Sequence, residues 1–280
     1  MNIKQHIAIA SQKLNASSTT PLLDTEMLMG HVLEKTKAYL LAHGDIEVST
    51  DETERFFALV EERATGKPMA YIIGHKEFYG REFFVDSRVL IPRPETEMII
   101  DEVLERYDAT AALRILDLGT GSGCIGITLK KEIPSSAVVA TDVSADALTV
   151  ARKNAKHWNA DIDFRLGDLF EALHNTDGFE MIISNPPYVD TKTQPSILQT
   201  QSLSFEPSIA LSPTNNDSFF IIHHILLEAR KWLQPTGLLL LEIGYNHGMR
   251  AQETARHYFP NKKITVKKDL AGHDRLLIVE

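Results

Sequence analysis

The feature that most constrains the fold is a regular alternation of short apolar runs and longer amphipathic segments from residue 113 onward. The short runs have the length and composition of buried strands, whereas the longer segments repeat their apolar residues at helical spacing. Strands are expected at 114–116, 137–141, 162–166, 181–184, 238–243, 264–266 and 276–279, and helices at 124–131, 145–157, 219–233 and 247–258. This alternation predicts an α/β fold with a doubly wound sheet, in which ligands bind at the carboxyl ends of the strands.

The N-terminal part of the chain has a different pattern. Apolar residues recur at helical spacing through residues 1–66, and Asp51-Glu52-Thr53-Glu54 opens a helix with carboxylates where the helix dipole favours them. Residues 76–91 are typical of short strands around turns, one of them at 89–91, and a helix begins at Pro92. We therefore expect a helical bundle at 1–75, a hairpin linker at 76–92 and the α/β domain at 93–280.

A glycine-rich turn follows the first strand of the α/β domain. Its sequence is Gly119-Thr120-Gly121-Ser122-Gly123, preceded by Asp117. Glycines allow a backbone to turn sharply and to approach a ligand closely. A dinucleotide fingerprint, G-x-G-x-x-G, would need a glycine where the chain has Cys124. The spacing G-x-G-x-G matches an S-adenosylmethionine loop better, and a tight turn without a ligand is the plainer alternative.

Acidic residues end the next two strands. Asp142 lies about 20 residues past the glycines, where a carboxylate can accept hydrogen bonds from both ribose hydroxyls. Its alternative role is to cap the next helix, for which Ser144 is also available. Asp168 stands where an acid can accept from the adenine amino group while Leu169 or Phe170 covers the ring, and a turn aspartate is the alternative. We therefore add Asp142, Asp168 and Leu169 to the predicted cofactor site.

The motif Asn185-Pro186-Pro187-Tyr188 follows the strand expected at 181–184 and so lies at the same edge of the sheet. Together with the S-adenosylmethionine loop, this motif suggests a methyltransferase that acts on an amide or amine nitrogen. An amide nitrogen is hard to methylate because its lone pair is delocalised, so such an enzyme must hold the NH2 group with acceptors. Asn185 supplies a side-chain oxygen, and Pro186 a carbonyl oxygen on a stiff backbone. Two acceptors orient the nitrogen and stabilise its developing positive charge, while Tyr188 can stack on the planar group.

From this chemistry we predict that Asn185, Pro186 and Tyr188 are catalytic and that Pro187 helps them to bind the substrate. Asn185 is also placed to touch the methionine portion of the cofactor. The alternative is an Asn-Pro-Pro turn without a function. We leave Glu242 and Tyr245, which end a later strand, outside the predicted site and interpret them as loop residues. Two roles are open for Glu206: it holds the substrate loop, or it caps a turn before Pro207.

Charge and composition disfavour several other classes of protein. The formal net charge of −9 argues against a basic surface that grips nucleic-acid phosphates. The chain has neither a run of about 18 apolar residues nor the apolar segment of a secretory signal at its start. Cys124 is its single cysteine, and no cysteine–histidine cluster has zinc spacing. We expect a cytoplasmic protein without a metal, a membrane or a direct nucleic-acid partner.

These residues resemble those of a known family, the glutamine methyltransferases of peptide chain release factors (the HemK family). The resemblance covers nearly the whole chain and is carried by Gly66–Gly74, Leu90–Glu97, Asp117–Gly123, Ser184–Val189 and Phe205-Glu206-Pro207. It implies a helical bundle that contacts the release factor, a hairpin link and a seven-stranded class I domain that uses S-adenosylmethionine. It further implies methyl transfer to the glutamine of the Gly-Gly-Gln motif of class 1 release factors. By this resemblance, Gly119–Gly123 form the cofactor loop and Asp142 binds the ribose. Leu169 lies beside the adenine, and Asn185–Tyr188 hold the glutamine.

Three alternatives stay open. A related enzyme methylates a glutamine of a large-subunit ribosomal protein with the same site chemistry, so the reach of the N-terminal bundle should choose between the two substrates. Adenine-N6 nucleic-acid methyltransferases also use motifs similar to Asn185–Tyr188. A non-catalytic binding module on the same fold is the third alternative, and the intact motif argues against it.

Overall fold

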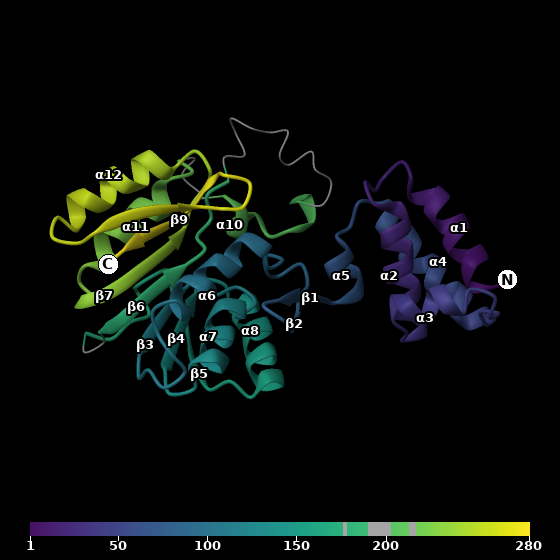
Figure 1. The fold of residues 1–280 in the computed structure, drawn as a ribbon, viewed down its shortest axis with the longest axis horizontal. Helices are drawn as coiled ribbons and strands as arrows, with labels where there is room; N and C mark the ends of the chain where they lie inside the picture. Colours follow the sequence, from purple (N-terminus) through teal and green to yellow (C-terminus); the bar gives the residue numbers. More distant parts are fainter. Residues whose placement is uncertain (176–177, 190–202, 213–216) are drawn as a thin grey trace. The chain divides into compact units, whose positions relative to one another are not determined.

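The fold is described from a computed structural model of the chain that covers all residues except 176–177, 190–202 and 213–216 (Figure 1). The chain divides into two compact units. The first comprises Met1–His75 and Ser196–Phe205, and the second Lys76–Pro195 and Glu206–Glu280.

The first unit contains a bundle of helices. Their bounds are α1 Ile3–Leu14, α2 Pro21–Leu33, α3 Lys37–Ala42, α4 Thr50–Ala64 and α5 Met69–Ile73. Capping boxes begin α1 at Asn2 and α4 at Ser49, and the acids of the predicted helix start lie in the first turn of α4. The unit has its own apolar core, which includes Leu14 and Phe56. The short η2 (Leu203–Phe205) also belongs to this unit.

A two-stranded hairpin follows, made of β1 (His75–Phe78) and β2 (Arg81–Phe84). Tyr79 and Gly80 turn it with φ angles of +50° and +71°. The prediction of a strand at 89–91 is wrong. Instead of joining a neighbouring strand, the backbone N–H of Ile91 donates to the Glu206 side chain at 3.0 Å.

A seven-stranded sheet forms the centre of the second unit and confirms the predicted α/β class. The strands are β3 Arg114–Leu118, β4 Ala137–Asp142, β5 Ile162–Leu166, β6 Phe179–Ser184, β7 Leu233–Glu242, β8 Ile264–Lys268 and β9 Asp274–Val279. Their order is β5-β4-β3-β6-β7-β9-β8, with β9 antiparallel to both of its neighbours. The chain runs outward from β3 to β5 and returns to β6 on the other side of β3. This reversal creates a switch point at the carboxyl ends of β3 and β6, where ligands bind in such sheets.

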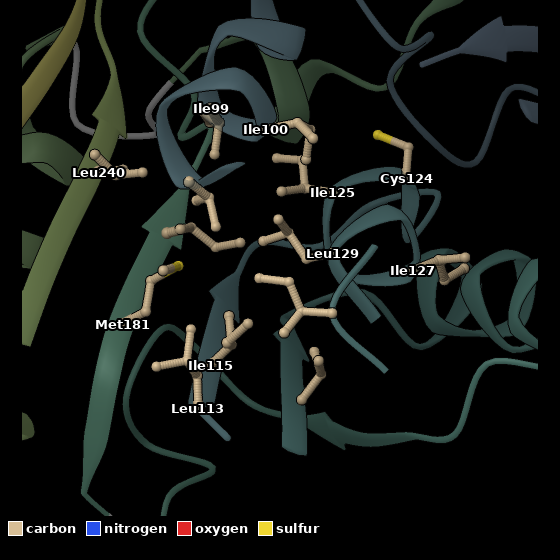
Figure 2. Close-up of a cluster of buried hydrophobic side chains, with 14 of the residues drawn as sticks. Ile99, Ile100, Leu113, Ile115, Cys124, Ile125, Ile127, Leu129, Met181 and Leu240 are labelled. Atoms are coloured by element: carbon tan, nitrogen blue, oxygen red, sulfur yellow. The ribbon is translucent and has the colours of Figure 1, made fainter. Parts of the chain in front are cut away.

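Helices cover both faces of this sheet (Figure 1). They are α6 Glu97–Leu104, α7 Cys124–Glu132, α8 Ala145–Trp158, α11 Phe220–Ala229 and α12 Gly248–Tyr258, with the shorter η1 Pro94–Thr96 and α10 Ser208–Leu211. Alternate strand residues point to opposite faces, so Ile115 packs under α6 and α7 while Leu116 packs in a second core with α11 and α12. Figure 2 shows side chains of α6 and α7 gathered over Ile115 and Met181.

One helix is shorter than its sequence predicts. The expected helix at 219–233 ends at Ala229, and Leu233 already pairs with Phe179 as the first residue of β7. The apolar run continues across this boundary, so its periodicity does not mark the change. The register of β7 against β6 then shifts between Phe179 and Met181, in a stretch that contains Pro235, a residue without the N–H that a strand ladder needs.

Candidate active site

A pocket of about 360 Å³ lies at the carboxyl ends of β3, β4 and β6 within the second unit. Nine predicted site residues line it, namely Gly119, Thr120, Gly121, Ser122, Asp142, Asp168, Leu169, Asn185 and Pro187. Gly123, Pro186 and Tyr188 are not among the described lining residues. The pocket therefore brings together most of the residues predicted for the cofactor and the first residue of the Asn-Pro-Pro-Tyr motif.

The glycine turn presents its backbone to this pocket. Gly119 and Gly121 have φ angles of +68° and +55°, and a Cβ atom at either position would meet nothing within 4 Å. Both glycines are therefore required by the backbone conformation, and the space beside them is open to a ligand. Gly123 also has a positive φ angle, +82°, but the space beside it is filled, because a Cβ there would lie 2.8 Å from Ile127 Cδ1 and 3.3 Å from Ala151 Cβ.

The buried Asp117 fastens the turn from below. Its Oδ2 accepts from the Thr120 hydroxyl at 2.6 Å and from the Gly126 N–H at 3.1 Å. Its Oδ1 has no hydrogen-bond partner among the described residues. Burial raises the pKa of this carboxyl to about 6. Asp117 thus holds the loop and the start of α7 together at the cost of placing an ionisable group in the core.

Asp142, the last residue of β4, joins the turn to the next loop. Its Oδ2 accepts from the Gly121 N–H at 2.8 Å and its Oδ1 from the Ser144 N–H at 2.9 Å. The Ser144 side chain itself caps α8 by accepting from Ala147 N at 3.1 Å, as its sequence position predicts. Burial raises the pKa of the Asp142 carboxyl. Since each carboxylate oxygen has about two acceptor positions, both oxygens keep capacity for a ligand.

Asp168 and Leu169 form the wall that follows β5. Asp168 is exposed, and its carbonyl closes a turn with the N–H of Glu171 at 2.9 Å. Leu169 has a φ angle of +47°, which is uncommon for a residue with a Cβ atom. Its carbonyl accepts from the Thr141 hydroxyl at 3.1 Å, so a side chain of β4 helps to hold this backbone at the pocket.

Asn185 and Tyr188 converge on a buried carboxylate that the sequence analysis set aside. Asn185 Nδ2 donates to Thr96 Oγ1 at 3.0 Å, and Thr96 Oγ1 donates to Glu242 Oε2 at 2.6 Å. The Tyr188 hydroxyl donates to the other oxygen, Glu242 Oε1, at 2.6 Å. Arg275 Nη1 lies 3.5 Å from the same hydroxyl. Burial raises the pKa of both Glu242 and Tyr188.

Sequence reasoning missed Thr96 and Glu242 as parts of this site. Glu242 follows the four leucines of 238–241, and a carboxylate that directly continues a buried strand is a signal that it has a buried partner. Thr96 lies inside the Leu90–Glu97 stretch that carries the family resemblance, but its hydroxyl has no recognisable role until the fold places it beside Asn185.

Glu206 connects the Leu90–Glu97 stretch to the segment before α10. Its Oε2 accepts from the Ile91 N–H at 3.0 Å, and its Oε1 pairs with Arg93 Nη2 at 2.5 Å. Arg93 and Pro207 both line the pocket. Of the two roles left open for Glu206, holding the loops at the pocket agrees with these contacts.

Neither a metal site nor a membrane-spanning helix is found in the part of the chain that the structure describes. No group of three or more histidine, cysteine, aspartate or glutamate side chains there is placed to hold a metal ion. Among the described helices, none has both the length and the apolar character that crossing a bilayer requires.

Comparison with known proteins gives two family matches and close full-length relatives. Residues 5–74 match the PrmC N-terminal domain, and residues 96–203 match the Methyltransferase small domain. The release factor glutamine methyltransferase of Koribacter versatilis is 39% identical over 279 residues, which are 99% of this chain and 98% of that protein.

Solved structures of methyltransferases share the fold. A methyltransferase from Pyrococcus furiosus aligns with a TM-score of 0.54 at 18% identity, covering 73% of this chain and 90% of its own. The 16S rRNA methyltransferase (RsmC) of T. thermophilus, solved in complex with AdoMet and guanosine, aligns with a TM-score of 0.51 at 17% identity, covering 74% of this chain and 49% of its own.

Proposed function

Because the chain belongs to the family of release factor glutamine methyltransferases, we propose that it methylates the side-chain amide nitrogen of the glutamine in the Gly-Gly-Gln motif of class 1 peptide chain release factors. The methyl donor is S-adenosylmethionine. The observation that carries this proposal is the presence of Asn185 in the same pocket as the open glycine turn 119–122.

The residues of the pocket fit the chemical groups of this donor. The turn at Gly119 and Gly121 leaves open space for a ligand to approach the backbone, and Asp142 keeps acceptor capacity for ribose hydroxyls. We expect the adenine beside Asp168 and Leu169, and the hydrogen bond from the Thr141 hydroxyl to the Leu169 carbonyl holds that wall. When bound, the sulfonium group supplies an activated methyl that needs no metal and no covalent enzyme intermediate.

The chain's own contribution to catalysis is orientation and charge stabilisation. Asn185 Oδ1 and the carbonyl of Pro186 accept from the substrate NH2 group, and Pro187 and Tyr188 complete the grip on its planar amide. These acceptors hold the nitrogen with a lone-pair direction toward the methyl carbon. They also stabilise the positive charge that the nitrogen acquires before it loses a proton.

The division of the chain suggests a division of labour. We assign substrate recognition to the helical bundle at 1–75, the link to the hairpin at 76–92 and methyl transfer to residues 93–280. Given the net charge of −9, the proposed partner is a protein rather than a nucleic acid, and the proposed compartment is the cytoplasm. The ribosomal-protein and adenine-N6 substrates are the competitors.

The direct test is transfer of a labelled methyl group from S-adenosylmethionine to a purified class 1 release factor. The parallel substrates are the same factor with Gly-Gly-Ala in place of Gly-Gly-Gln, a large-subunit ribosomal protein and duplex DNA. Label on the unaltered factor alone is the expected result. Label only on the ribosomal protein or the DNA overturns the substrate, and no label on any of them overturns the reaction.

A further inference from the structure

We infer that Glu242 is a positioning residue that, acting through Thr96, determines which end of the Asn185 side-chain amide faces the pocket. This inference rests on the proposed function, because the orientation matters when the pocket must hold a substrate NH2 group. Glu242 is not among the described residues that line the pocket, so it acts on the reaction through its neighbours rather than by contact.

The orientation follows from counting protons. An ionised carboxylate only accepts hydrogen bonds, so at 2.6 Å from Glu242 Oε2 the hydroxyl of Thr96 must donate its one proton. Thr96 Oγ1 then has only lone pairs to offer to Asn185 at 3.0 Å, and the Asn185 atom that faces it must be the NH2 group. The Asn185 carbonyl oxygen is therefore the end that remains for the substrate.

The reversed amide would defeat the site. It would present an N–H group of Asn185 to the N–H group of the substrate, and two donors cannot bond to each other. It would also place Asn185 Oδ1 against Thr96 Oγ1, whose proton is already donated to Glu242. The carboxylate therefore excludes the wrong orientation without touching the substrate.

The network is anchored well enough to set an orientation. Glu242 and Thr96 are only 1% and 2% exposed, so water does not supply substitute partners. Glu242 ends β7 in register with Leu276 of β9, and Thr96 ends η1 at the start of α6. The second carboxylate oxygen of Glu242 accepts from the Tyr188 hydroxyl. The same carboxylate therefore also fixes the Tyr188 ring, which we propose contacts the substrate amide.

The charges around Glu242 indicate when the network operates. Burial raises the pKa of Glu242 and the charge of Glu95 adds to this effect, whereas Arg275, from β9, favours the ionised form. The hydroxyls of Thr96 and Tyr188 both donate to the ionised form and stabilise it further. A protonated Glu242 could donate to Thr96, which would free the Thr96 proton for Asn185 and reverse the amide.

The decisive variant is Thr96→Val, which keeps the shape of the side chain and removes the hydroxyl. We expect kcat for release factor methylation to fall about 10- to 100-fold, with a much smaller change in KM, because the lost interaction orients a transition-state acceptor. Thr96→Ser restores the hydroxyl and should recover most of the lost rate. The matched control is Thr128→Val, since Thr128 is also fully buried and its hydroxyl has no hydrogen-bond partner among the described residues.

A second readout does not depend on the substrate. The NH2 resonances of Asn185, identified as the pair absent from Asn185→Ala, should exchange slowly with solvent in the unaltered chain and in Thr128→Val, and quickly in Thr96→Val. An unaltered rate and an unaltered exchange in Thr96→Val would overturn the inference. If the unaltered enzyme methylates no release factor, the proposed substrate fails, and the amide exchange still decides whether the Thr96 hydroxyl holds the Asn185 NH2 group.

The pH profile separates positioning from a purely structural role. In the unaltered enzyme the rate should fall at acidic pH as Glu242 gains a proton. In Thr96→Val, where the amide is no longer coupled to that carboxylate, this acidic fall should be weaker. An identical acidic fall in both proteins would mean that another group is titrating and would count against the inference.

Discussion

Four buried carboxylates hold the loops of the active-site unit in place. Asp117, Asp142, Glu206 and Glu242 are each at most 9% exposed. Each accepts at least two hydrogen bonds from backbone N–H, hydroxyl or guanidinium groups, as Asp142 does from Gly121 and Ser144. A buried charge is tolerated only when it is bonded in this way, so each acid specifies the position of its donors. The loops around the pocket are therefore held by acids that already accept hydrogen bonds before any ligand arrives.

Asp142→Ala should weaken cofactor binding. The substitution removes the acceptors proposed for the ribose and also the tether on Gly121 N–H. Charge-assisted hydrogen bonds of this kind correspond to about a 10- to 100-fold change in affinity. Calorimetric titration with S-adenosylmethionine measures the change, and Asp146→Ala, at an exposed acid in the first turn of α8, is the matched control. An unchanged Kd for Asp142→Ala would contradict the assignment to ribose.

Asp117 should make stability depend on pH in a defined direction. Burial raises its pKa from the ordinary 3.8 to about 6, so between these values the folded chain holds a proton that the unfolded chain has released. The free energy of unfolding therefore falls as pH rises from about 4 to about 6, by roughly 3 kcal/mol in total, and stays lower above pH 6. Asp117→Asn retains an oxygen for Thr120 and Gly126 but has no such titration.

Chemical denaturation at about pH 4.5 and pH 7 tests this in the absence of cofactor. The free energy of unfolding at pH 7 minus that at pH 4.5 should be more positive in Asp117→Asn than in the unaltered chain, because the variant lacks the extra stability at the lower pH. A pH dependence that the substitution leaves unchanged would falsify the role given to Asp117.

Single residues were predictable from sequence where a motif marked them. Residues 119–122 of the glycine turn, Asp142 and Asn185 all stand at strand ends beside the expected switch point, and all line one pocket. Glu242 and Thr96 are far apart in sequence, and their roles depend on a contact across the fold that no local pattern encodes. This is why the proposed acceptor was found from the sequence while the groups that orient it were not.

At the scale of elements, short segments with little regular structure around the pocket are held to one another by a few hydrogen bonds. The backbone of Ile91 and the side chain of Arg93 both bond to Glu206, which precedes α10. Val189, after β6, donates its N–H to the carbonyl of Leu211 at the end of α10 at 2.8 Å. The pocket wall at Pro92–Arg93 and Pro207–Ala210 therefore depends on a few polar contacts rather than on a strand ladder.

Glu206→Gln should loosen this wall. The side chain keeps an acceptor for one partner but loses the charge that pairs with Arg93. Because Arg93 is about one-third exposed, we expect a loss of roughly 1–3 kcal/mol in the free energy of unfolding, below the cost for a fully buried pair. Glu228→Gln, which breaks the more exposed pair with Lys231, is the control and should cost less than about 0.5 kcal/mol. Equal losses in the two variants would contradict the fastening role.

The elements themselves were predicted well where periodicity changes sharply. Each of the seven strands of the sheet overlaps a predicted range, although β7 begins at Leu233 instead of 238, and α8 starts after Ser144 as predicted. The helix expected to reach residue 233 failed because the apolar run passes from α11 into β7 without a break in hydrophobicity. The bundle's α3 and α5, six and five residues long, were not foreseen because they are too short for a helical period to show.

At the scale of the whole molecule, two units with separate apolar cores occupy one chain. Among the described residues, the core of the bundle draws on residues 3–73, and the two cores around the sheet draw on residues 78–279. The predicted catalytic and cofactor residues all belong to the second unit. The bundle therefore has no evident part in the chemistry, which is consistent with the substrate-recognition role proposed for it.

An exposed apolar pair on α2 offers a way to test that role in the intact chain. Leu23 and Met27 are 43% and 40% exposed and stand four residues apart, so their side chains are neighbours on the helix surface. Met27 also borders a shallow depression of about 270 Å³ with Gly30, His31 and Ile73. Exposed apolar side chains that lie together are typical of protein-binding surfaces.

We expect the double variant Leu23→Glu, Met27→Glu to lower kcat/KM for an intact release factor about tenfold or more, because charged groups would replace apolar contact area. Methylation of a short Gly-Gly-Gln peptide, which is too small to engage both units, should proceed at an unaltered rate. Met249→Glu, at an exposed methionine of α12, is the matched control, since its side chain is 77% exposed in the other unit. If the double variant methylates both substrates like the unaltered enzyme, this face of the bundle does not recognise the factor. If it loses both activities together, the bundle affects the catalytic unit itself, and recognition and chemistry are not divided between the units as proposed.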